Sequence, residues 1–154
     1  MNKKGSYSLE ALFVFPVILM MLIFVAELGF LMYDWAVVNY TVSSTAALAA
    51  KEGTFSTAAR TSMQNYLKQW TTSGKALTYV NVSGTTYTPS PTQAIIYGTP
   101  SSSYVQYGGT ITVGICFPYK FKTFTVNALS KWFIQNNQMY LRVQSSAISE
   151  VYRE

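Results

Sequence analysis

The chain has 154 residues and a formal net charge of +5, with 49% hydrophobic and only 11% charged residues. It has no histidine and a single cysteine, Cys116, which excludes histidine-based triads, histidine metal sites, an intrachain disulfide and a cysteine zinc cluster. No Asp or Glu lies between Gly53 and Ser149, so a pair of carboxylates for acid–base catalysis cannot form there. We therefore expect a protein that is not an enzyme and has no cofactor and no metal site.

The chain begins with a short basic head, Met1–Lys4, and continues into a long apolar run. From Ala11 to Ala26 this run has no charged residue. About 20 mostly apolar residues are enough for a helix to cross a bilayer. We expect a transmembrane segment over about residues 11–33, longer than the apolar part of a cleaved secretory signal. The lysines of the head predict a cytoplasmic amino terminus and a carboxy-terminal domain outside.

A single long helix is predicted from Leu9 to about Lys51, with Gly53 as its stop. Pro16 lies inside the run, where it removes one backbone hydrogen bond and should kink the helix. Beyond the membrane segment the apolar residues recur at helical spacing, so that stripe packs on the chain's own domain, on a helix of another subunit, or on both. The residues of the stripe are Trp35, Val38, Val42, Ala46 and Ala49.

Carboxylates within or beside an apolar helix are costly, so each needs an explanation. Glu10 lies at the start of the run. It either reaches the headgroup layer or pairs, on assembly, with a positive partner such as a free amino terminus. Glu27 and Asp34 are seven positions apart and so lie on nearly one helix face. They form either a polar seam between subunits, with Lys51 as a candidate partner, or a pair at the outer interface in contact with water. The sequence favours neither alternative for Glu27 and Asp34.

The remainder of the chain predicts a small domain. Ser56 or Thr57 should cap a second helix that reaches about Thr72. The predicted fold class is α+β, with a long N-terminal transmembrane helix, a small mostly antiparallel sheet and a short packing helix. Strands are expected at residues 77–82, 95–97, 104–107, 110–117 and 138–148, with Pro118 ending or bending the fourth, and a short helix or irregular loop at 123–136.

The region between Gly53 and Ser149 contains basic residues and no acidic ones. Within it, Lys120 and Lys122 alternate with aromatic residues, a pattern that can hold single-stranded nucleic acid. The same pattern is typical of an edge strand whose lysines prevent edge-to-edge pairing, and this interpretation is favoured. We keep Lys120 and Lys122 as candidate contacts for an anionic ligand and expect no nucleic acid as the primary partner.

The stretch Lys3–Glu10, KKGSYSLE, resembles the cleavage site of a type IV prepilin. The resemblance implies that a prepilin peptidase cuts after Gly5 on the cytoplasmic side, so that Ser6 becomes the new amino terminus. Glu10 is then the fifth residue of the mature chain, and by the same resemblance it pairs with the amino terminus of a neighbouring subunit.

A narrower resemblance is to the TadE-like pilins, which are minor, pilin-like subunits of tight-adherence (Tad) pili. It is carried by the stretches Ser8–Leu19, Val25–Phe30 and Ala46–Gly53, with a first Glu, an early Pro, a second Glu and an Ala-rich segment. Leu28, Phe30 and Lys51 depart from the family pattern, and the resemblance is thin beyond residue 53.

The resemblance implies a leader at residues 1–5, a long helix at 6–53 and an extracytoplasmic domain at 54–154. The chain would be a structural subunit that reaches the pilus or cell surface and supports adhesion, secretion or DNA transfer by the whole apparatus. Its partners would be other pilin subunits, prepilin peptidase and the membrane assembly platform. The alternative is an uncleaved, signal-anchored protein whose basic domain binds an anionic ligand.

Overall fold

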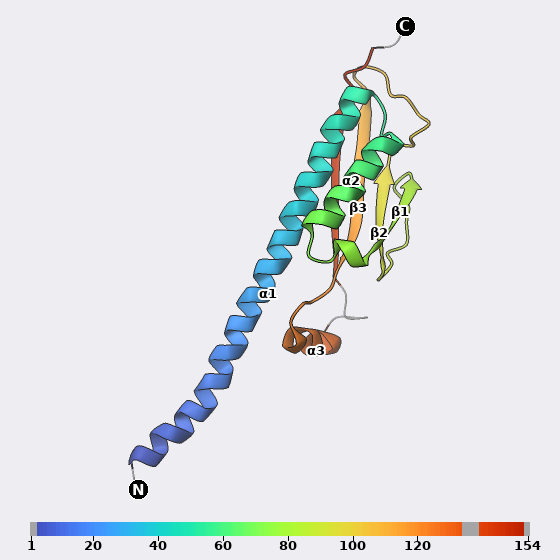
Figure 1. Cartoon of the computed structure of the whole chain (residues 1–154). Helices are drawn as coiled ribbons and strands as arrows, with labels where there is room; N and C mark the ends of the chain where they lie inside the picture. Colours follow the sequence, from blue (N-terminus) through green and yellow to red (C-terminus); the bar gives the residue numbers. More distant parts are fainter. Residues whose placement is uncertain (1–2, 134–138, 153–154) are drawn as a thin grey trace.

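The computed structural model describes residues 3–133 and 139–152. Its dominant element is α1, Lys3–Glu52, a continuous helix of 50 residues that confirms the prediction of one long helix. The helix continues through Pro16, and the kink expected there stays a prediction. It ends at Gly53, whose positive φ of 69° suits a glycine, and the Thr54 N–H bonds back to the Ala49 carbonyl at 3.2 Å. Only the C-terminal part of α1 lies beside the rest of the chain (Figure 1).

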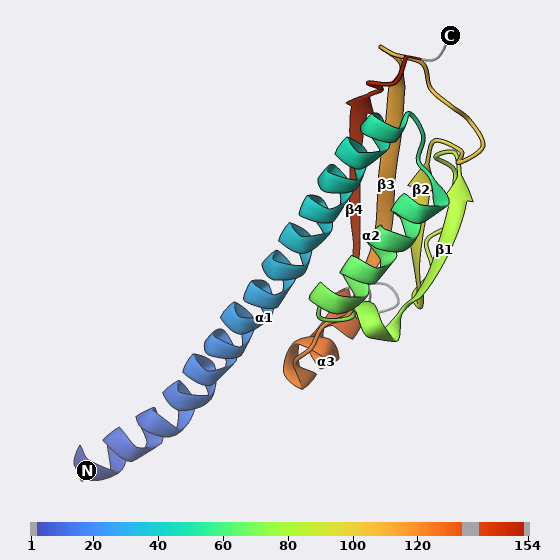
Figure 2. The same ribbon diagram turned by 45° about the horizontal axis from the view of Figure 1, so that its top comes forward.

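The second helix, α2, spans Thr57–Trp70 and returns alongside the C-terminal half of α1 (Figure 2). The predicted cap is confirmed, because Ser56 precedes the helix and its hydroxyl accepts a hydrogen bond from the Ala59 N–H at 3.1 Å. A short 3-10 helix, η1, follows at Gly74–Ala76. This turn leads the chain from α2 into the sheet.

The sheet has four strands in the order β1-β2-β3-β4. β1 pairs with β2 in parallel, while the β2–β3 and β3–β4 pairs are antiparallel, so the predicted α+β class with a mostly antiparallel sheet is confirmed. The parallel pair was not foreseen and requires the connection at residues 84–92 to cross back along the sheet. The strands are β1, Thr78–Ser83; β2, Gln93–Gly98; β3, Thr110–Tyr119; and β4, Met139–Ile148.

The core lies between one face of the sheet and the two helices. Alternate residues of β3 point into it, as the period-two pattern predicts, and so does the helical stripe of α1. Trp35 is the exception in that stripe, because its side chain is 48% exposed. The stripe therefore packs on the chain's own domain, which was one of the two predicted roles. The main core residues are Val38, Val42, Ala46, Ala49, Phe55, Met63, Leu67, Ile96, Ile111, Val113, Ile115 and Phe117.

Two details of the predicted sheet are wrong. Residues 104–107 form no strand, because the Val105 N–H bonds to the Gly53 carbonyl at 2.8 Å and holds the segment against the end of α1. β3 continues through Pro118 to Tyr119, so the alternative in which Pro118 ends the strand is wrong, while the bend stays a prediction. Beyond Cys116, β3 pairs with β4 alone, and a missing N–H is tolerated where a strand has one free edge.

The segment after β3 contains α3, Phe124–Phe133, so the helical alternative for this region is confirmed. It lies beside α1 at the end of the domain nearest to the isolated half of that helix (Figures 1 and 2). The last residues of the predicted segment, 134–136, and Gln138 of the predicted final strand are outside the described residues.

Candidate assembly helix and its carboxylate anchors

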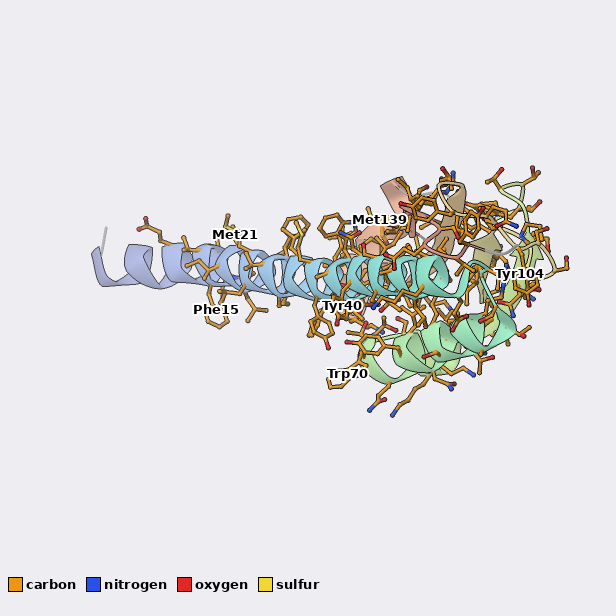
Figure 3. All side chains as sticks on the ribbon, turned by 90° about the horizontal axis from the view of Figure 1, so that it is seen from above. Phe15, Met21, Tyr40, Trp70, Tyr104 and Met139 are labelled. Carbon is orange, nitrogen blue, oxygen red and sulfur yellow. The ribbon has the colours of Figure 1, made fainter. Side chains whose placement is uncertain are left out.

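The N-terminal half of α1 is an exposed apolar surface. Between Leu12 and Val25 the large hydrophobic side chains that face outward are 47% to 72% exposed. Figure 3 shows Phe15 and Met21 projecting from opposite sides of this half, at a distance from the domain. Within the described residues, α1 is the helix that is long and apolar enough to cross a membrane. An exposed apolar surface of this extent marks a contact with lipid or with a partner.

The residues predicted from the prepilin resemblance lie at the start of this surface. Gly5 and Ser6 are in the first turns of α1, and Glu10 stands one turn beyond Ser6 with an exposed side chain. Pro16 follows inside the helix. The predicted cleavage residues and Glu10 therefore lie together at the N-terminal end of the helix, far from the folded domain (Figure 1).

Glu27 marks the point where the domain first meets α1. Its side chain is only 3% exposed, and it accepts four hydrogen bonds of 2.8–2.9 Å from three residues. The donors are the Tyr119 hydroxyl, the backbone N–H groups of Lys122 and Thr123, and the Thr123 hydroxyl. Thr123 directly precedes α3, so the carboxylate also lies at the positive end of that helix. Burial and the hydrogen bond to Glu27 raise the pKa of Tyr119, which keeps this hydroxyl protonated as a donor.

Asp34 forms a second anchor about two turns further along α1. Its side chain is fully buried and accepts hydrogen bonds from the Thr72 backbone N–H at 2.8 Å and from the Thr72 hydroxyl at 2.6 Å. Thr72 lies just after α2, so Asp34 ties the end of α2 to α1. Together the two carboxylates fasten the end of α2 and the start of α3 to one face of α1.

These partners differ from both predicted alternatives for Glu27 and Asp34. The spacing of seven does place them on one face, but that face is covered by the chain's own domain. The alternative in which both carboxylates touch water is wrong, because the domain buries them. Lys51 is exposed in the last turn of α1, about 25 Å along the helix from Asp34, so it does not neutralise Asp34 within the chain. Its pairing across a subunit contact stays a prediction.

Sequence reasoning missed Tyr119, Thr123 and Thr72 as partners of the carboxylates. The sequence did show that a buried carboxylate at either position would need donors, but it gave no local signal for which residues would supply them. Of the two candidate ligand contacts, Lys122 donates its ammonium group to the Thr72 carbonyl at 3.1 Å and to the Ser73 hydroxyl at 2.7 Å. Lys120 is exposed beyond the end of β3, so the predicted edge strand does not extend over this pair.

A second cluster lies on the sheet face that α1 and α2 do not cover. Tyr87, from the β1–β2 connection, stacks on Tyr97 at a centroid distance of 4.6 Å, and the Arg142 guanidinium lies 5.9 Å from the Tyr87 ring. Cys116 is buried beneath this cluster, and burial raises the pKa of its thiol. Within the described residues, no group of three or more His, Cys, Asp or Glu side chains could hold a metal ion. The cluster therefore has the character of a packing contact.

The exposed apolar half of α1 and the Glu27 anchor both lie within a stretch that matches a known protein family. Residues 5–47 match the model of the TadE-like protein family. This match confirms the predicted resemblance, and it covers Gly5, Glu10, Glu27 and Asp34. The family is one of structural, pilin-like proteins associated with Tad pili, and the match lies within α1. Searches of the curated proteins and of the solved structures give no match.

Proposed function

We propose that this TadE-like chain is a pilin-like subunit, inserted in the membrane through α1, cleaved after Gly5 and assembled through the N-terminal half of that helix. The observation that carries the proposal is the exposed apolar surface from Leu12 to Val25, which lies inside the family match. Lipid covers such a surface before assembly, and neighbouring helices cover it afterwards. Prepilin peptidase, other pilin subunits and the membrane assembly platform are the partners that this route requires.

The transfer from lipid to a helical bundle gains little hydrophobic free energy, because both surroundings are apolar. Specificity must therefore come from close helix packing and from polar groups. An acidic side chain inside the hydrocarbon costs on the order of 2.5–3.5 kcal/mol, and a positive partner offsets this cost. In the apolar half, Glu10 is the exposed carboxylate, and the amine of Ser6 in a cleaved neighbour would be its partner.

Glu27 and Asp34 have a different role in this proposal. Their hydrogen bonds are satisfied within the chain, so they hold the domain in a fixed position on α1 instead of joining subunits. The subunit would then enter an assembly as a rigid domain on a long apolar stem. This division assigns assembly to Glu10 and domain orientation to Glu27 and Asp34.

The test is the amino-terminal sequence and intact mass of the protein from its native membrane and sheared surface fractions. We expect a chain that begins at Ser6 and lacks Lys3 and Lys4, which takes the formal charge from +5 to +3, or 9 basic minus 6 acidic residues. The variant Gly5→Arg should stay uncleaved and remain in the membrane. A wild-type chain that begins at Met1 and occurs only in membranes would overturn the proposal and favour the signal-anchored alternative.

A further inference from the structure

The helix α3 is fixed beside α1 at the level where the exposed apolar half ends. The backbone N–H groups of Lys122 and Thr123 bond to Glu27, and the Thr123 carbonyl accepts the first α3 bond from the Asn127 N–H at 2.9 Å. The start of α3 is therefore tied to the position on α1 directly after the uncharged run that ends at Ala26. If α1 crosses a bilayer, α3 lies at the outer surface of that bilayer (Figure 1).

Two neighbouring residues of α3 have the opposite burial to that expected in a helix that packs on a domain and faces water. Leu129 is 42% exposed, whereas the neighbouring Ser130 is only 6% exposed and donates its hydroxyl to the Asn127 carbonyl at 2.9 Å. A water-facing helix normally buries its leucines and exposes its serines. Helices that lie in a membrane interface turn leucine and aromatic residues toward the acyl chains and lysines toward the headgroups, and an outward-facing Leu129 fits the apolar face of such a helix.

The charges near α3 complement an anionic surface. Lys120 precedes α3 and Lys131 lies in its last turn, and both side chains are exposed. No acidic residue occurs between Lys120 and Phe133. The nearest carboxylate, Glu27, is buried and fully hydrogen-bonded. Exposed lysines close to a bilayer are attracted to anionic headgroups, and the attraction falls within a Debye length of the surface.

We propose that α3 lies on the outer membrane surface before assembly, with Leu129 at the boundary of headgroups and acyl chains and with Lys120 and Lys131 against anionic phospholipid headgroups. This inference rests on the proposed membrane insertion of α1. It also moves the outer end of the membrane span from about residue 33 to Glu27. The mature helix from Ser6 to Ala26 would then cross about 31 Å, which matches a bilayer core of about 30 Å.

The test uses the full-length chain in phosphatidylcholine vesicles that contain or lack phosphatidylglycerol. Single nitroxide labels are placed at Leu129→Cys, at Leu19→Cys and at Ser102→Cys, each in a Cys116→Ala background. The accessibility of each label to oxygen and to a water-soluble nickel chelate reports its depth in the bilayer. Leu19 is an exposed residue of the apolar half and serves as the membrane reference, while Ser102 is an exposed loop residue distant from α3 and serves as the water reference.

We expect the oxygen-to-nickel accessibility ratio at position 129 to exceed that at position 102 several-fold and to stay below that at position 19. Phosphatidylglycerol should deepen the label at 129, and Lys131→Gln should reverse this change. Lys51→Gln removes the same charge at the far end of α1 and should leave the depth unchanged.

A label at 129 that is as water-accessible as the one at 102 would overturn the interfacial position of α3. A depth that does not respond to phosphatidylglycerol or to Lys131→Gln would overturn the headgroup contact. The label at Leu19 separates these results from a failure of the proposed function, because a water-exposed label there would mean that α1 is not inserted at all.

Discussion

The two halves of α1 belong to one continuous helix but have opposite surroundings. From Leu12 to Val25 the large side chains are mostly exposed, while from Val38 to Ala49 the inward stripe is almost completely buried by the sheet and α2. Glu27 and Asp34 lie between these two regions. The helical state of the C-terminal half is stabilised by packing within the chain, whereas the proposed function makes the N-terminal half depend on lipid or on other subunits.

This difference separates what two kinds of experiment measure. Unfolding of the isolated chain reports on the C-terminal half and its anchors, because only that half exchanges intrachain contacts for water. Membrane insertion and assembly report on the N-terminal half. A substitution in one half should therefore change one measurement and leave the other unchanged.

The largest expected effect on unfolding comes from Glu27→Ala. The change leaves two backbone N–H groups, a tyrosine hydroxyl and a threonine hydroxyl without their acceptor, and should lower the free energy of unfolding by about 3–5 kcal/mol. Urea unfolding in mild detergent, followed by tryptophan fluorescence, measures it. Glu10→Ala is the matched control and should unfold like the wild type. Equal destabilisation by the two variants would contradict the conclusion that only the C-terminal half of α1 and its anchors stabilise the isolated chain.

A smaller effect is expected from two bridged glycines, Gly98 at the end of β2 and Gly84 just after β1. Gly98 has a φ of +148°, and a Cβ there would collide with the Thr112 carbonyl oxygen, so Gly98→Ala should lower the free energy of unfolding by about 2–3 kcal/mol. Gly84 has a φ of +90° but open space around it, so Gly84→Ala should cost only about 1 kcal/mol. Membrane insertion should be unchanged in both. Equal urea midpoints for the two variants would show that the collision is relieved by a shift of β2.

A pH-dependent effect is expected from the cluster on the outer sheet face. Burial and the neighbouring Tyr97 raise the pKa of Tyr87 to about 12, above the ordinary tyrosine value of about 10. Because the folded pKa is raised, this contribution to stability is complete below about pH 10 and is lost as the pH rises from about 10 to about 12. Urea unfolding across this range should show a smaller loss of stability in Tyr87→Phe. If Tyr87→Phe has the same pH profile as the wild type, the loss of stability in this range does not come from ionisation of Tyr87.

Local signals in the sequence predicted the helices well. Gly53 and Ser56 define the end of α1 and the start of α2 through hydrogen bonds to residues only a few positions away, so their effect can be read from the sequence. The alternation in β3 likewise predicted which residues enter the core. Residues 104–107 contain two tyrosines and a valine, which are common in strands, but a tertiary bond from Val105 to Gly53 decides their conformation.

The candidate site was predictable in part, for the same reason. The sequence identified Glu27 and Asp34 as carboxylates on one helix face that needed partners. The donors could not be identified, because Tyr119 and Thr123 are 92 and 96 residues away from Glu27 along the chain. Only the path of β3 across the sheet brings them to α1.

The smallest effect on folding, and the sharpest test of the division of α1, is expected from Gly29. A Cβ at this position meets nothing within 4 Å in the isolated chain, so Gly29→Leu should change the free energy of unfolding by no more than about 0.5 kcal/mol. In an assembly a small residue lets another helix approach closely, and a leucine would block that approach. We therefore expect Gly29→Leu to reduce the amount of protein in the sheared surface fraction, while Gly29→Ala keeps it. Normal assembly of Gly29→Leu would mean that no helix packs closely at this point, so that the subunit contact is confined to the region between Ser6 and Val25.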